Sequence, residues 1–288
     1  MSFSQNVKEE LVKHMSPARH CQLAELAALL HFCGQYGQEE DGTYLVGFQT
    51  ENETVAKKGF TLLKKTFNIE TGVKLSAEQM QEISHKIGDL EKPVNPLLLK
   101  NACCQRAFLR GAFLSTGSIS DPAKGYHLEF VCTDAGKAAQ IQEMLHNFDI
   151  EGKIVLRKKY HVVYLKEGES IVDLLNVCEA HVALMELENL RILKDMRNSI
   201  NRRVNCEAAN ITKTVNAATR QIEDIEYIQS HGGLGMLPDN LREMAEVRME
   251  YPDATLKELG EYLNPPVGKS GVNHRLQKLN EIAERLKK

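Results

Sequence analysis

Long apolar runs are missing from this sequence. No stretch approaches the roughly 18 consecutive apolar residues that a membrane-spanning helix needs. The first residues, MSFSQNVKEELVKH, are charged and amphipathic, unlike the apolar segment of a signal peptide. We therefore expect a cytoplasmic protein that does not bind a membrane. Apolar residues still make up 42% of the 288 residues, which is enough to build the cores of about two domains.

Cysteine pairs of the kind that hold zinc are also missing. The seven cysteines include no C-x-x-C pair, and none has a histidine at zinc-finger spacing. Their odd number does not suggest a disulfide framework. We expect reduced, mostly buried thiols and predict neither a metal site nor a cofactor.

A net positive charge is absent as well, since the formal net charge is −3. The charges are nevertheless uneven. Residues 191–220 carry seven basic against two acidic side chains and residues 269–288 carry six against two, whereas residues 221–268 carry three against ten. Two basic islands thus flank an acidic stretch, and each is interpreted either as a nucleic-acid contact or as a solvated helix face.

One helix-like stretch occurs twice. CQLAELAALLHFCG at 21–34 and CQRAFLRGAFLSTG at 104–117 share Cys, Gln, Ala, Leu and Gly at five of fourteen positions. Small residues at helical spacing predict that the two helices pack together at a pseudo-twofold axis, each ending at a glycine. These residues are Ala24, Ala27, Ala28 and Gly34 in the first copy and Ala107, Gly111, Ala112 and Gly117 in the second.

The segments that follow the two helices also correspond. Each continues with a strand-like run that ends in Thr and an acid, and then with an amphipathic helix that ends in FNIE (67–70) or FDIE (148–151). GVKLS (72–76) or KIVLR (153–157) comes next, so we infer a tandem repeat of about 82 residues. Each unit is predicted to be roughly α-β-α-β-β-α, with MQEISHKIG (80–88) as a poorly patterned last strand in the first copy.

The duplicated helix resembles the signature helix of the LAGLIDADG homing endonucleases. That resemblance implies an α+β fold of two αββαββα-like repeats whose sheets form a saddle over DNA. In that family the acid before the closing glycine holds the catalytic divalent metal. The segments LAALLHFCG and LRGAFLSTG place Cys33 and Thr116 there, and neither side chain is the hard oxygen anion that Mg²⁺ prefers. The resemblance therefore implies that the architecture is kept and the catalytic acids are lost.

Two ways to rebuild a metal site remain open. The nearest acids, Glu25, Glu39 and Asp121, would be the ligands of a working endonuclease with displaced carboxylates. A soft metal on His31 and Cys33 is disfavoured, because residues two apart on a helix point to different faces.

The carboxyl-terminal part is predicted to be helical throughout. A first helix begins after residue 203 and has a narrow apolar stripe, and the Gly-rich segment SHGGLGMLP marks a boundary near 231–238. Three helices follow, DNLREMAEVRMEYP, TLKELGEYL and SGVNHRLQKLNEIAERL, the second opened by a capping box of Thr255 and Glu258. The stripe of the first helix is Ile211, Val215, Ala218, Ile222 and Ile225, and the third of the later helices buries Val272, Leu276, Leu279, Ala283 and Leu286.

This order of helices predicts a helix-turn-helix that reads DNA, although plain interaction domains share the pattern. The candidate base-reading and phosphate-binding residues at the start of the third helix are Lys269, Ser270, Gly271, Asn273, His274, Arg275 and Lys278. Candidate phosphate contacts in the preceding polar segment are Arg202, Arg203, Lys213 and Arg220.

Together, the motifs NRRVNCEAAN, QIEDI and TLKELGEYLNPPVGKSGVNHRL resemble the WhiA family. The resemblance implies a non-enzymatic, nucleoid-associated transcriptional regulator of sporulation, cell division or chromosome segregation that binds double-stranded DNA. The expected parts are a LAGLIDADG-like domain (1–190, repeats at about 19–95 and 96–180), a helical linker (191–231) and a helix-turn-helix domain (232–288). An active endonuclease and a scaffold for a protein partner are the alternatives. The excess of acids in 1–190, 25 against 20 basic residues, favours a protein partner for that domain.

Overall fold

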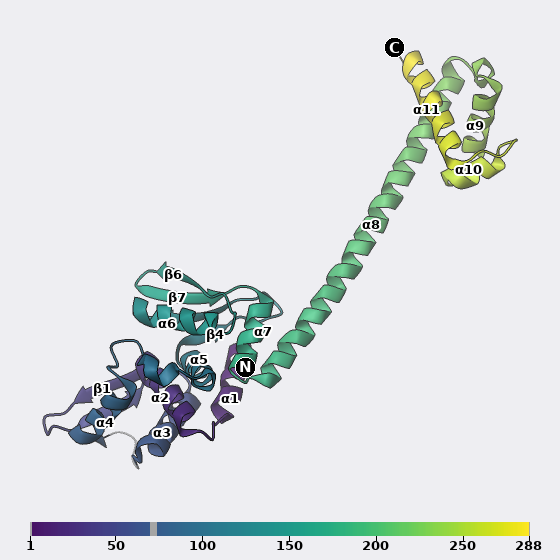
Figure 1. Ribbon diagram of the computed structural model, residues 1–288. Helices are drawn as coiled ribbons and strands as arrows, with labels where there is room; N and C mark the ends of the chain where they lie inside the picture. The colour runs from purple at the N-terminus through teal and green to yellow at the C-terminus, as the bar shows by residue number, and fades with distance from the viewer. Residues whose placement is uncertain (1, 70–73, 288) are drawn as a thin grey trace. The chain divides into compact units, whose positions relative to one another are not determined.

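The computed structural model describes residues 2–69 and 74–287 (Figure 1). Contacts within the chain divide it into two compact units, Met1–Asp195 and Met196–Lys288. Within the described residues, no helix combines the length and the apolar character needed to cross a membrane.

The first unit contains the two predicted repeats, preceded by α1 (Phe3–Lys13). The first repeat consists of α2 (Arg19–Cys33), β1 (Gly34–Gln38), β2 (Tyr44–Phe48), α3 (Glu53–Phe67), β3 (Lys74–Leu75) and α4 (Ala77–Ile87). The short 3₁₀ helix η1 (Pro96–Leu99) leads to the second, which consists of α5 (Ala102–Thr116), β4 (Gly117–Ile119), β5 (Leu128–Cys132), α6 (Ala135–His146), β6 (Lys153–Arg157), β7 (Tyr160–Leu165) and α7 (Gly168–Val177). The expected α+β fold with a duplicated LAGLIDADG-type domain is confirmed.

The two antiparallel sheets preserve the duplication in their register. Their strand orders are β1-β2-β3 and β4-β5-β7-β6. The glycine that closes each signature helix pairs with a phenylalanine on the next strand, Gly34 with Phe48 and Gly117 with Phe130. The sequence pattern missed β1 and β4, because both are short and follow the helix without a break.

The predicted last strand of the first repeat is wrong. The segment MQEISHKIG lies mostly in α4, which begins with a complete capping box between Ser76 and Gln79. Met80, Ile83 and Ile87 are buried at spacings of three and four, the period of one helix face. Residue 70 of FNIE and residues 72 and 73 of GVKLS lie outside the described residues.

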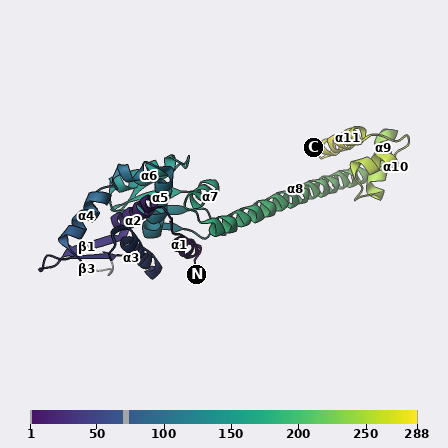
Figure 2. The ribbon, with the colours of Figure 1, turned by 60° about the horizontal axis from the view of Figure 1, so that its bottom comes forward.

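Helices α2 and α5 lie side by side at the centre of this unit, as Figures 1 and 2 show. The six predicted small residues within the helices, namely the five alanines and Gly111, are buried, and the helices end at Gly34 and Gly117 as expected. The closest approach is at Gly111, where an added Cβ would lie 2.6 Å from the Glu25 carbonyl oxygen and 2.8 Å from the Ala28 Cβ. The absence of a side chain at Gly111 therefore permits this helix spacing.

The second unit is a small helical bundle. Its elements are the carboxyl-terminal turns of α8 (His181–His231), η2 (Leu234–Met236), α9 (Asp239–Glu250), α10 (Leu256–Tyr262) and α11 (Lys269–Leu286). The capping box of Thr255 and Glu258 is present, and the apolar positions predicted for α11 line the core, with Leu286 half-buried at its edge. At Gly260 in α10 an added Cβ would collide with the Val267 carbonyl oxygen. The segment between α10 and α11 can therefore pack against α10 because residue 260 is a glycine.

The end of α8 belongs to the same core as the three shorter helices. Ile225 and Ile228 are fully buried in it. The buried Arg248 side chain of α9 joins two elements, since its Nε donates to Gln221 on α8 and its Nη1 to the Ala254 carbonyl before α10. Asp224 on α8 accepts hydrogen bonds from Asn280 and Lys287. The polar groups of α8 thereby fix the bundle to the helix.

Replacing Gly111 with alanine is expected to destabilise the first unit by about 1–3 kcal/mol, because the new methyl group meets backbone of the facing helix that cannot move away. Thermal unfolding followed by circular dichroism measures the change. Gly37→Ala is the control, since nothing lies within 4 Å of a Cβ at Gly37 in strand β1. Equal melting temperatures for the two variants would contradict the proposed role of Gly111.

Candidate nucleic-acid interface

The structure places Cys33 and Thr116 at the carboxyl ends of α2 and α5, where the catalytic acids of a LAGLIDADG nuclease are expected. The Cys33 thiol is buried, donates to the Leu29 carbonyl oxygen at 3.2 Å and lies 3.5 Å from the Ser115 hydroxyl. Burial raises its pKa, so the sulfur stays a neutral thiol. The Thr116 hydroxyl donates to the Ala112 carbonyl oxygen. Neither group presents a negative charge to a metal.

A hollow adjoins these helix ends, and one of its lining side chains is a lysine. Lys8, Glu51, Glu53 and Ser115 are among its lining residues. Lys8 is half-buried, and burial lowers the pKa of its ammonium group while the nearby Cys33 and Glu51 oppose the shift. Glu53 forms an ion pair with Lys57 at 2.7 Å. A lysine beside Glu51 disfavours a divalent cation by like-charge repulsion.

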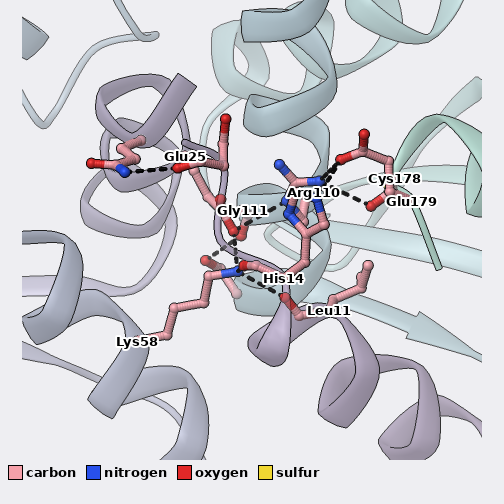
Figure 3. Close-up of polar contacts among 11 residues, drawn as sticks. Leu11, His14, Glu25, Lys58, Arg110, Gly111, Cys178 and Glu179 are labelled. Carbon is pink, nitrogen blue, oxygen red and sulfur yellow. Dashed lines mark hydrogen bonds and ion pairs between the residues drawn. The ribbon is translucent and has the colours of Figure 1, made fainter. Parts of the chain in front are cut away.

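Glu25, one of the acids considered for a displaced nuclease centre, is committed to a buried ion-pair network (Figure 3). Its side chain is fully buried, 2.5 Å from the Lys58 ammonium and 3.3 Å from Arg110 Nε. Lys58 also donates to the carbonyl oxygens of Leu11 and His14, both at 2.7 Å. Two neighbouring cations and complete burial make Glu25 inaccessible to a metal ion.

Arg110 extends the network to the end of α7. Its Nη1 contacts the Glu179 carboxylate and the Cys178 carbonyl oxygen (Figure 3). Burial opposes ionisation of Glu179, yet the hydrogen bond and charge of Arg110 lower its pKa overall. Burial and the Arg110 charge lower the pKa of His14, whose Nε2 is 2.9 Å from Glu179. The network joins α2, α3 and α5 to the segment after α7.

The other residues considered for a metal site also have local partners. The Asp121 carboxylate is exposed and accepts from the Ala123 amide at 2.9 Å, while Glu39 is 2.5 Å from Lys74. Both ring nitrogens of His31 face backbone carbonyl oxygens, those of Lys92 and Ile87, and none faces Cys33. The expectation that His31 and Cys33 point apart is thus met.

In the second unit, α11 presents a polar face to solvent at its amino-terminal end. Lys269, Ser270, Asn273, His274 and Lys278 are exposed. The first turn of α11 holds no acid, and no side chain caps its amino terminus. Free backbone N–H groups and the helix dipole at this end suit a phosphate. These five predicted residues therefore share one accessible, electropositive surface.

Two of the predicted residues lie differently. Arg275 is only 17% exposed, with its Nη1 3.7 Å from Glu243 and 3.4 Å from the Asn240 carbonyl oxygen on α9. Gly271 lies against Val267, whose side chain an added Cβ would strike. Both sit on the flank of α11 that meets neighbouring elements, and their spacing of four positions puts them on the same side of the helix. The exposed Gln277, which the sequence analysis did not select, occupies the outer face instead.

The basic residues predicted on α8 form a stripe. Arg202, Lys213 and Arg220 are exposed. Lys213 and Arg220 follow Arg202 by 11 and 18 positions, so a helix of 3.6 residues per turn brings all three to one face. The stripe spans about 27 Å at about 1.5 Å per residue. Arg203 is exposed one position away. The opposite face carries Ile211, which is 64% exposed, and other apolar residues of the predicted stripe.

Comparisons with known proteins cover nearly the whole chain. Three family models match: the WhiA N-terminal LAGLIDADG-like domain at 19–83, the WhiA LAGLIDADG-like domain at 105–197 and the WhiA C-terminal HTH domain at 200–283. A probable cell division protein WhiA from Lachnoclostridium phytofermentans is 54% identical over 312 aligned residues, covering 100% of both chains.

The chain belongs to the WhiA family. Another relative, the probable cell division protein WhiA from Alkaliphilus oremlandii, is 50% identical and covers 99% of this chain and 98% of its own. The crystal structure of full-length DUF199/WhiA from Thermotoga maritima matches with 26% identity and a TM-score of 0.60, covering 99% of each chain. The family and the helix-turn-helix domain suggest a DNA-binding regulator, and the degenerate LAGLIDADG domain suggests a protein without enzymatic activity.

Replacing Glu25 with glutamine is expected to cost about 3–5 kcal/mol of stability, because Lys58 and Arg110 would then be buried without their shared counter-charge. Urea unfolding at pH 7 measures this loss. Glu53→Gln is the matched control, since the pair of Glu53 and Lys57 is exposed to solvent and adds little to stability. A midpoint for Glu25→Gln equal to that of Glu53→Gln would show that the buried network does not hold the unit together.

Proposed function

We propose that this chain is a non-enzymatic, sequence-specific DNA-binding transcriptional regulator that acts in cell division, and in chromosome segregation or sporulation where the lineage has them. The observation that carries the proposal is the polar amino-terminal face of α11, exposed on a folded helical unit that matches the WhiA HTH domain. The names of the relatives support the role in cell division. Residues 232–288 supply the base-reading part, and residues 191–231 add contacts to the DNA backbone.

In this proposal α11 enters the major groove and reads base edges. Asn273, His274 and Gln277 offer donors and acceptors of the kind that discriminate bases, while Lys269 and Lys278 neutralise phosphates on either side. Arg275 acts as a positioning residue, since it contacts Asn240 and Glu243 of α9 rather than solvent. The many acids of α9 and α10 leave α11 as the favourable side for DNA.

The stripe of Arg202, Lys213 and Arg220 on α8 supplies sequence-independent affinity. From Met196 to Ile222 the sole acid is Glu207, so the positive charge of the stripe is little compensated along the chain. Exposed guanidinium and ammonium groups of this kind contact phosphate oxygens and release counterions. The acidic balance of residues 1–190 favours a protein partner, rather than DNA, for the LAGLIDADG-like domain.

The absence of catalysis follows from the same charges. Hydrolysis of DNA by a LAGLIDADG centre needs carboxylates that hold a divalent metal at the helix ends, and here Cys33 and Thr116 stand there with Lys8 lining the adjacent hollow. Cleavage of duplex DNA in Mg²⁺ that disappears in Glu51→Gln would contradict this part of the proposal and revive the endonuclease alternative.

Asn273→Ala and His274→Ala are expected to relax sequence preference, each costing about 1–3 kcal/mol on the preferred site and little on random DNA. Chromatin immunoprecipitation first locates the sites that the protein occupies on its own chromosome. Fluorescence anisotropy then compares binding to a duplex of the preferred site with binding to a duplex of random sequence. Lys257→Ala, at an exposed position of α10, serves as the control. Unchanged discrimination in both variants would exclude α11 as the reading helix.

Lys213→Ala is expected to weaken binding to all duplexes alike and to reduce the slope of log K against log salt by about 1. A titration from low to physiological salt measures the slope. Lys153→Ala, on the exposed strand β6 of the first unit, is the matched control and is expected to leave the slope unchanged. If Lys153→Ala lowers the slope and Lys213→Ala does not, the LAGLIDADG-like domain contacts the DNA and the α8 stripe does not.

A further inference from the structure

Four potential metal ligands meet at the amino-terminal ends of α2 and α5. His20 and Cys21 lie in the first turn of α2, and Cys103 and Cys104 lie in the first turn of α5. One ligand atom from each residue lies within 4.8 Å of all the others. The two helices are parallel, since Cys33 meets Ser115 at their other ends, so this cluster is a helix length away from the degenerate nuclease position.

The spacing of the four atoms suits a single tetrahedral ion. The His20 Nδ1 atom lies 3.2 Å from the Cys104 sulfur and 3.3 Å from the Cys21 sulfur. Sulfur ligands of a tetrahedral zinc ion lie about 3.8 Å apart when each Zn–S bond is about 2.3 Å. Ligand atoms already within 4.8 Å of one another are therefore close to the separation that a tetrahedral ion requires.

The duplication explains how the cluster is built. Cys21 and Cys104 occupy equivalent positions in the repeated helix, and His20 and Cys103 precede them. The pseudo-twofold packing of α2 on α5 places the two pairs opposite each other. Cys21 and Cys104 are buried, while His20 and Cys103 are exposed and leave the cluster open to an incoming ion.

Neither α2 nor α5 has a side-chain hydrogen bond at its amino-terminal cap or an acid in its first turn. The positive ends of both helix dipoles therefore face the cluster, and they partly offset the cost of burying thiolates once a metal has displaced the thiol protons.

We propose that His20, Cys21, Cys103 and Cys104 bind one zinc ion in a closed, structural Cys₃His site. Four protein ligands leave no open coordination position, so the ion holds the helix pair together and takes no part in catalysis. Three S–Zn bonds and one N–Zn bond form, and the three thiol protons pass to solvent.

The experiment uses the full chain, reduced and stripped of metal, and then titrated with zinc and with Co²⁺. Cys103→Ser and His20→Ala are the test variants, because both positions are exposed and neither substitution removes a buried side chain. Cys206→Ser, at an exposed cysteine on α8 outside the cluster, is the control. The expected result is one zinc per wild-type chain, a raised melting temperature with zinc, and the d–d and thiolate charge-transfer bands of tetrahedral Co²⁺.

The affinity for zinc is expected to fall at least about 10-fold in Cys103→Ser and His20→Ala and to stay unchanged in Cys206→Ser. Equal zinc affinities of the wild type and Cys103→Ser overturn the proposal, as does a Co²⁺ spectrum without thiolate bands. DNA binding is not the readout, so failure here is distinguishable from failure of the proposed regulator.

Discussion

The first unit depends on the close approach of α2 and α5. Two helices whose facing positions are alanine and glycine pack with their backbones nearly in contact, as the 2.6 Å between a Cβ at Gly111 and the Glu25 carbonyl oxygen shows. Everything that lies at the ends of the pair is positioned by this contact. At one end it brings Cys33 beside Ser115, and at the other it brings Cys21 beside Cys104.

Charged side chains buried inside this unit stabilise its fold. Glu25, Lys58 and Arg110 form a buried network. An enzyme of this fold class would instead have polar groups at the helix ends, free to bind metal and substrate. A buried triad stabilises only when each charge has a partner, and the carbonyl oxygens of Leu11 and His14 supply the remaining hydrogen bonds for Lys58. The basic residues that we propose for DNA contacts lie instead in the second unit, exposed on α8 and α11.

Local patterns identified the elements whose signals are short-range. The repeated helix, the capping box of Thr255 and Glu258, and the apolar face of α11 were all predicted and are present. The strand expected for MQEISHKIG from the other repeat is wrong, since the spacing of Met80, Ile83 and Ile87 is helical. The position of Arg275 depends on α9, a separate helix, which supplies Glu243.

The sequence by itself determined the duplicated fold, the membership in the WhiA family and the loss of the metal-binding acids, because each is recorded in residue types at fixed spacing along one segment. Only the tertiary structure decided which charged side chains form buried ion pairs and which cysteines lie close together. His20 and Cys104 are 84 positions apart, and no spacing rule links them. Their juxtaposition arises from helix packing, which depends on the shape of two facing surfaces rather than on the order of residues in either.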